Sequence, residues 1–129
     1  MKHISKEDYL RTIYELHSQH GVRVVDIAKK LDINKASVSE MIRKLANEKL
    51  LTIKPYSPIH LTYKGKQKAK ALVKKHNIVK KFAKRILNHD DETAHNEAHK
   101  LEHAFSHDSI QKLEDFLYGR AQIPPDYVG

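Results

Sequence analysis

Residues 25–45 read VDIAKKLDINKASVSEMIRKL, and this stretch decides the fold of the front half of the chain. Apolar residues recur at helical spacing on both sides of a short turn at 32–34, and Ala28 is small where two helices must cross closely. The pattern predicts a helix over 24–31 and a second helix over 35–48 capped by Asn34, which together form a helix-turn-helix. The residues that we expect to be buried are Ile27, Leu31, Val38, Ile42 and Leu45.

Two stretches of alternating residues follow, at 51–54 and 59–62, and they predict a hairpin with its tip at 55–58. A helix-turn-helix followed by such a hairpin is a winged helix. Its second helix would offer polar side chains to base edges, and its hairpin would contact phosphates. Glu40 has two interpretations, because it could accept a hydrogen bond from cytosine or pair with Lys44. We expect DNA contacts from Asn34, Lys35, Ser37, Ser39, Glu40, Arg43, Lys44, Lys54 and Tyr56.

The charge is divided unevenly along the chain. Residues 1–87 contain 21 Lys and Arg against 7 Asp and Glu, a balance of +14, and residues 88–129 contain 3 against 9, a balance of −6. The stretch 49–89 has 12 basic residues and no acidic one. This asymmetry indicates a half that binds a polyanion, joined to a half with another role. A lysine-rich surface that only keeps the protein in solution is the alternative.

The bulk composition excludes several classes of protein. The chain has 129 residues, 40% hydrophobic and 31% charged, and no cysteine. A disulfide framework, a thiolate zinc site and a cysteine nucleophile are therefore excluded. We see neither a signal peptide nor an apolar run of the roughly 18 residues that a membrane span requires. We expect a soluble cytoplasmic protein.

Outside the winged helix the chain is expected to be helical, so the fold class is mainly α. A first helix should run from a cap at Ser5 to about residue 17, with Asp8 closing a capping box. A long helix over 63–87 has apolar residues at 69-72-79-83-86 and His76 in the missing place, a spacing that implies a partner helix. Further helices are expected over 92–105 and 107–118, followed by an extended tail at 122–129.

A cluster of possible metal ligands falls within the predicted helix 92–105. At 100° per residue they occupy one strip about 100° wide, directly beside an apolar strip. Imidazoles and a carboxylate without thiols suit Mn, Fe, Co, Ni or Zn in the divalent state. His76 is either a hydrogen-bonded core histidine or a ligand from a second helix. The ligands on the strip are His95, His99, Glu102 and His103.

Two other interpretations of this cluster stay open. The chain has ten histidines, so surface histidines could gather here by chance. Residues 99–103, HKLEH, also match the H-x-x-E-H pattern of a zinc hydrolase, in which two histidines bind zinc and the glutamate is the base. That match is short, and little chain remains to build a substrate cleft, so we do not expect an enzyme.

The chain resembles the iron- and manganese-dependent repressors of the diphtheria toxin repressor type. The resemblance is carried by DYLRTIYEL at 8–16, SVSEM at 37–41, Leu61-Thr62 with Gly65, and EAHKLEH at 97–103. It covers nearly the whole chain in one order. It implies a winged-helix domain, placed here at 1–74, and a helical metal-binding and dimerisation domain at 75–129. It also implies a homodimer on palindromic operators that represses metal homeostasis genes.

Carried over residue by residue, the family's main metal site falls on Asp8, His99, Glu102 and His103, and its ancillary site falls on His76 and His95. The resemblance implies Fe(II) or Mn(II) as the activating metal, with Zn(II), Co(II) or Ni(II) binding in vitro. A constitutive winged-helix protein that binds DNA without metal gating is the alternative function.

Several positions depart from the family's pattern. Position 99 is usually cysteine in the iron branch and glutamate in the manganese branch, but it is His99 here. Asp8 agrees with the manganese branch and Arg11 with the iron branch. Lys80 replaces an acidic ancillary ligand, and we expect no SH3-like third domain.

Overall fold

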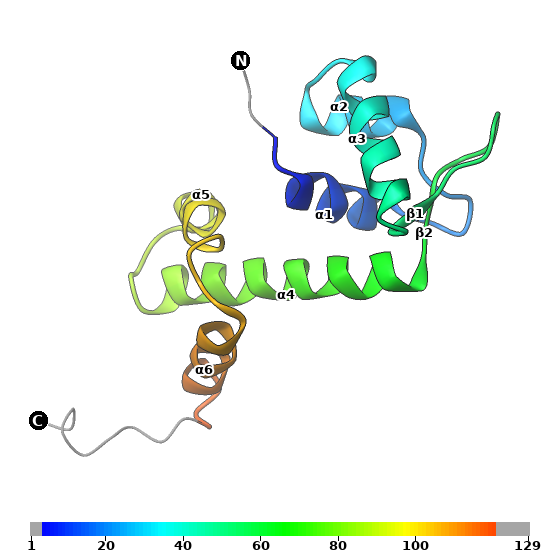
Figure 1. The fold of residues 1–129 in the computed structure, drawn as a ribbon. Coiled ribbons are helices and arrows are strands. Elements are labelled where there is room, and N and C mark those ends of the chain that lie inside the picture. The colour runs from blue at the N-terminus through cyan, green and yellow to red at the C-terminus, as the bar shows by residue number, and fades with distance from the viewer. Residues whose placement is uncertain (1–3, 121–129) are drawn as a thin grey trace, which may run out of the picture. The chain divides into compact units, whose positions relative to one another are not determined.

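The computed structural model describes residues 4–120, so the expected extended tail at 122–129 lies outside the described residues. The chain divides into two compact units, Met1–Val73 and Lys74–Gly129. Helices dominate both units, as Figure 1 shows, and the prediction of a mainly α fold is confirmed. The elements are α1 (Lys6–Leu16), α2 (Val24–Leu31), α3 (Lys35–Asn47), β1 (Leu51–Thr52), β2 (His60–Leu61), α4 (Tyr63–Arg85), α5 (Asp91–Leu101) and α6 (His107–Leu117).

Helices α2 and α3 form the predicted helix-turn-helix. Asp32 ends α2 in the left-handed region at φ 55°, which turns the chain sharply. The side chain of Asn34 then accepts a hydrogen bond from the N–H of Ser37 at 2.8 Å, so it caps α3 as the sequence predicts. Ile27, Val38 and Leu45 are fully buried in the core of this unit.

Helix α1 begins with the predicted capping box. The hydroxyl of Ser5 accepts a hydrogen bond from the N–H of Asp8 at 3.1 Å, and the Asp8 carboxylate accepts from the N–H of Ser5 at 3.2 Å. These two bonds satisfy N–H groups that have no partner within the helix. The cap therefore fixes where α1 starts and holds the Asp8 side chain against it.

The hairpin is shorter than predicted. β1 and β2 pair antiparallel over two residues each, with Leu51 opposite Leu61, and an isolated bridge joins Val22 to Ile59. Pro55 and Pro58 lie between the strands, and proline has no N–H to donate to a ladder. The four-residue strands that we expected are therefore wrong in length, although the hairpin is present.

Helix α4 contributes residues to both units, because the boundary at residue 73 falls within it (Figure 1). Ala69 is buried in the core of the first unit, whereas Val79 and Ala83 are buried in the second. The expected burial of Ile86 is wrong, since this side chain is 50% exposed. The N–H of Ile86 still donates to the carbonyl of Phe82 at 2.8 Å, so this residue lies in the last turn of the helix, and Asn88 turns the chain at φ 58° just beyond it.

Helix α5 is also shorter than predicted, ending at Leu101 rather than at Phe105. The N–H of Ala104 donates to the carbonyl of Leu101 at 3.0 Å, so residues 102–104 form a turn. The core of this unit consists of Ile78, Val79, Ala98, Ile110 and Leu117. Among the described residues, no helix is long and apolar enough to cross a membrane.

Candidate metal centre and nucleic-acid interface

The second unit holds a carboxylate that is almost fully buried among histidines. Glu102 lies in the turn after α5 and is 4% exposed. Its Oε2 is 2.8 Å from Nδ1 of His76, a buried residue of α4. A carboxylate is costly to bury unless it is hydrogen-bonded and its charge is balanced. The contact with His76 supplies part of that compensation and joins α4 to the end of α5.

Three histidine rings gather beside this carboxylate. The Nε2 atom of His76 is 3.3 Å from Nδ1 of His95, and the two ring centroids are 4.9 Å apart. The ring centroid of His99 lies 5.4 Å from that of His76 and 5.1 Å from that of His95. The sequence predicted that His95 and His99 share one face of a helix, and the structure adds that this face meets His76.

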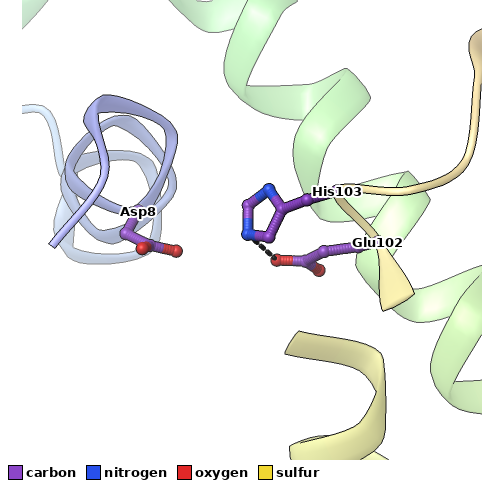
Figure 2. Close-up of side chains that lie close together, drawn as sticks. All are labelled: Asp8, Glu102 and His103. Carbon is purple, nitrogen blue, oxygen red and sulfur yellow. Dashed lines mark ion pairs between the residues drawn. The ribbon is translucent and has the colours of Figure 1, made fainter. Parts of the chain in front are cut away.

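The other oxygen of Glu102 faces two more imidazole nitrogens. Its Oε1 is 3.8 Å from Nδ1 of His99 and 3.7 Å from Nε2 of His103, and Figure 2 shows the His103 pair. His76, His95, His99, Glu102 and His103 are called the histidine cluster below. Its donors are imidazole nitrogens and one carboxylate, the set that divalent iron, cobalt, nickel and zinc accept and that also suits manganese. These residues therefore fit a divalent transition metal.

Asp8 belongs to the first unit, where α1 carries its carboxylate (Figure 2). Besides the capping bonds, its Oδ2 accepts a hydrogen bond from the hydroxyl of Ser5 at 2.7 Å. Its Oδ1 lies 2.9 Å from a guanidinium nitrogen of Arg11, a buried residue. Both oxygens of Asp8 are thus engaged within the first unit.

Lys80 follows His76 by one turn of α4. Its ammonium lies 3.1 Å from Oδ1 of Asp91, and Lys84 contacts the same oxygen at 3.1 Å. The position at which the resemblance expects an acidic ligand is therefore occupied by one member of a lysine–aspartate network.

A groove of about 550 Å³ runs between α3 and the hairpin in the first unit. Ser39, Arg43 and Tyr56, three of the predicted DNA-contact residues, line it, and apolar side chains such as Ile42 form part of its wall. None of the described residues that line it is acidic. Such a groove suits a sugar-phosphate strand.

The other predicted DNA-contact residues are exposed but do not line this groove. Asn34 uses its side chain as a helix cap, and Glu40 lies 4.0 Å from Lys44, the pairing that was one of its two interpretations. The remaining positions Lys35, Ser37 and Lys54 are exposed.

Sequence reasoning missed Arg23 and Ser57, which also line the groove. Arg23 directly precedes α2, and the bridge between Val22 and Ile59 holds this segment beside the hairpin. An isolated arginine before a helix carries no signal of its own. The excess of basic residues at 49–89 indicated only in general that more cations would contact DNA, and it did not single out Arg23.

Comparison with known proteins accounts for both units. Residues 3–59 match the iron dependent repressor N-terminal DNA binding domain, and residues 62–124 match the metal binding and dimerisation domain of the same family. The chain belongs to the iron dependent repressor family. The resemblance inferred from the sequence is therefore confirmed.

Two similar proteins agree with this family. The HTH-type transcriptional regulator MntR of Bacillus subtilis (strain 168) is 37% identical over 114 residues, which cover 88% of this chain and 80% of the relative. The uncharacterized HTH-type transcriptional regulator MJ0568 of Methanocaldococcus jannaschii is 36% identical over 115 residues, covering 88% of this chain and 92% of the relative. These relatives are transcriptional regulators, so the expectation that the chain is not an enzyme is confirmed.

Solved structures are similar over almost the whole chain. The manganese regulator SloR has a TM-score of 0.78 at 33% identity and is covered over 58% of its length, with 96% of this chain matched. ScaR with bound Zn2+ has a TM-score of 0.77 at 31% identity, with 95% of this chain and 57% of that chain covered. This chain thus spans somewhat more than half the length of these two structures.

Proposed function

We propose that this protein is a cytoplasmic, homodimeric repressor of metal homeostasis genes that binds a palindromic operator when it is loaded with Fe(II) or Mn(II). The observation that carries the proposal is the histidine cluster in the part of the chain that matches a metal-binding domain. The names of the relatives support it, since SloR is described as a manganese regulator and MntR as a transcriptional regulator.

In this proposal, His99, Glu102 and His103 hold the main metal together with Asp8, and His76 and His95 form the ancillary site. A bound divalent cation would supply the positive charge that draws carboxylates and imidazoles together. Glu102 faces His76 with one oxygen and His99 and His103 with the other, so it contributes to both groups of ligands. Zn(II), Co(II) and Ni(II) are expected to bind in vitro for the same reason.

Asp8 gives the metal site its connection to DNA binding. Its carboxylate caps α1 through Ser5 and pairs with Arg11, so recruitment to the metal site replaces bonds that fix the first turn of α1. Since α1 packs in the core that also holds the helix-turn-helix, a change at this turn reaches the DNA-binding unit. We expect metal and operator to bind cooperatively, with a coupling of about 1–3 kcal/mol.

On DNA, α3 supplies base contacts and the groove beside it supplies phosphate contacts. We propose that Arg23 acts with Arg43 as a cationic wall of this groove and contacts the phosphate backbone. Arg23→Ala should weaken operator and non-operator DNA about equally and lower the slope of log affinity against log salt by about 1. Lys112→Ala, in α6, is the matched control and should leave the slope unchanged.

The test of metal gating is an operator titration by fluorescence anisotropy with and without Mn(II) or anaerobic Fe(II). The wild type should bind the operator at least ten-fold more tightly with metal, and His103→Ala should lose this difference. Glu92→Gln, an exposed carboxylate on α5, is the control and should retain it. Equal affinity of the wild type in the presence and absence of metal would reject metal gating.

One observation favours a constitutive DNA-binding protein as the second candidate. The direct contact between His76 and Glu102 at 2.8 Å is also how a buried polar network satisfies itself without a metal. Calorimetry with Fe(II), Mn(II) and Zn(II) separates the candidates. Stoichiometric binding at micromolar affinity or tighter, abolished by Glu102→Gln, supports the metal-dependent regulator, and no binding supports the constitutive protein.

A further inference from the structure

A second cavity lies in the unit Lys74–Gly129, at the end of α4. Its volume is about 360 Å³, within the range of small-molecule sites. Five of the six described residues that line it are charged, and α4 supplies all six except Asp91, the first residue of α5. This cavity is called the basic recess, and it is lined by Asn77, Lys80, Lys81, Lys84, Arg85 and Asp91.

The charges of the basic recess do not balance. Among the described residues that line it, four have cationic side chains and Asp91 alone has a carboxylate. Lys80 and Lys84 both direct their ammonium groups to Oδ1 of Asp91, each at 3.1 Å. The hydrogen bond from Lys80, followed by the one from Lys84, holds the pKa of Asp91 below its usual value. The recess therefore already holds one anionic group and retains a surplus of positive charge.

Several of the N–H donors in the recess are available to a ligand. An ammonium group carries three N–H donors, and one contact with Asp91 uses one of them on Lys80 and one on Lys84. The side chain of Lys80 is only 27% exposed, which is low for a lysine, whereas that of Asp91 is 71% exposed. A ligand would therefore displace the exposed Asp91 side chain more easily than the side chain of Lys80.

The fold itself explains only part of this arrangement. Lys81 donates to the hydroxyl of Tyr118 at 2.6 Å, and Arg85 donates to the carbonyl of Leu117 at 3.2 Å, so these two residues attach the end of α6 to α4. Cations in the last turn of a helix also complement its dipole. Neither role requires Lys80 and Lys84 to converge on one exposed carboxylate beside a cavity.

We propose that the basic recess binds an anion with two adjacent phosphate groups, such as inorganic pyrophosphate or the diphosphate of a nucleotide, and that Asp91 occupies the anion position in its absence. Two phosphate groups match a cluster of several cations better than a single carboxylate does, because each phosphate offers several acceptor oxygens and more negative charge. The recess shares no residue with the histidine cluster, although Lys80 follows His76 by one turn of α4.

The test is calorimetric titration of the full, metal-free chain with inorganic pyrophosphate, and in parallel with ADP. Metal is removed because pyrophosphate chelates divalent cations. We expect one saturable binding event per chain. Lys84→Gln should weaken it at least five-fold, because a cation is lost from an exposed position. Asp91→Asn should strengthen it at least three-fold, since the competing carboxylate is removed. Binding of pyrophosphate but not ADP would identify the free anion, and tighter binding of ADP would identify a nucleotide.

Lys112→Gln is the matched control, because Lys112 also pairs with an aspartate, Asp108 at 3.0 Å, but lies outside the recess. Equal weakening by Lys112→Gln and Lys84→Gln, or weaker binding by Asp91→Asn, would overturn the proposal. So would the absence of saturable binding, or an effect of Lys84→Gln on operator affinity alone, which would make the recess a DNA-phosphate contact. Metal-dependent operator binding by Lys84→Gln should stay normal, so this test and that of the proposed function fail independently.

Discussion

Gly65 in the first turns of α4 offers a test of the packing in the DNA-binding unit. A Cβ added to Gly65 would lie inside the van der Waals surface of the Leu50 carbonyl oxygen and 3.2 Å from a methyl carbon of Leu61. That carbonyl accepts a hydrogen bond from the N–H of Thr62 at 3.0 Å. The backbone just before β1 would therefore have to move for Gly65→Ala to fold.

The sign of the effect is what makes the test informative. At an ordinary helix position, Gly→Ala stabilises a protein by about 0.5–1 kcal/mol. Here, the overpacking costs about 1–3 kcal/mol, and strain on the Thr62–Leu50 hydrogen bond adds to this cost. We expect Gly65→Ala to lower the free energy of unfolding by about 1–3 kcal/mol. Each kcal/mol lowers the Tm by about 4–8 °C for a unit of this size.

The assay is urea and thermal unfolding of the full chain followed by circular dichroism. The control pair is Gln67→Gly and Gln67→Ala, because Gln67 is exposed on the same helix and the pair measures the glycine–alanine difference without a clash. If Gly65→Ala stabilises the chain by the increment that the Gln67 pair gives, the close approach to Leu50 does not exist and the packing argument is refuted.

Three further predictions concern stability. Ser5→Ala removes the hydroxyl that caps α1 and should lower the free energy of unfolding of the metal-free chain by about 1 kcal/mol, with Thr at this position restoring it. Burial, followed by the charges of Lys66 and His60, lowers the pKa of His17. The unfolded chain therefore binds more protons below about pH 6.5, so stability should fall as the pH falls from about 6.5 toward the folded pKa. His17→Gln should flatten this dependence in urea titrations between pH 7 and 5, and an unchanged slope would count against the assignment. Ile110→Ala should cost about 2–4 kcal/mol, because this buried side chain packs α6 into the second core, and a loss below 1 kcal/mol would show that the core is loosely packed.

Local signals in the sequence predicted the helix caps and the helix-turn-helix. Ser5 with Asp8, and Asn34 before α3, act within three residues of themselves, so their roles depend little on the rest of the fold. The apolar spacing predicted the burial of Ile27, Val38 and Leu45 for the same reason.

The ends of the helices were predicted less well, because turns and residues with positive φ end a helix even where the apolar spacing continues. Helix α4 ends at Arg85 and Asn88 turns the chain at φ 58° just after the exposed Ile86, and the turn after Leu101 ends α5 before His103. The side chains of the predicted strip still lie close together, since Glu102 keeps helical backbone angles at the end of α5. Regular spacing describes a helix only as far as the helix continues.

Contacts between distant segments could not be read from spacing. The position of His76 in an apolar seam favoured a ligand over a core histidine but did not name its neighbours, and only the fold shows its nitrogens facing Glu102 and His95. Arg23 was missed because the bridge that brings it to the hairpin joins residues far apart in the chain. The convergence of Lys80 and Lys84 on Asp91 likewise depends on the turn between α4 and α5.

The bonds that Ser5 and Arg11 make with the Asp8 carboxylate affect how sensitive the regulator is to the metal concentration. On the proposed mechanism, a cation recruits this carboxylate only by replacing those bonds, so their strength is subtracted from the apparent affinity. Substitutions at positions 5 and 11 would then shift the concentration at which the regulator responds while leaving every imidazole in place. The metal concentration that triggers the response would then be set by residues that do not contact the metal, independently of the choice of metal, which depends on the imidazoles.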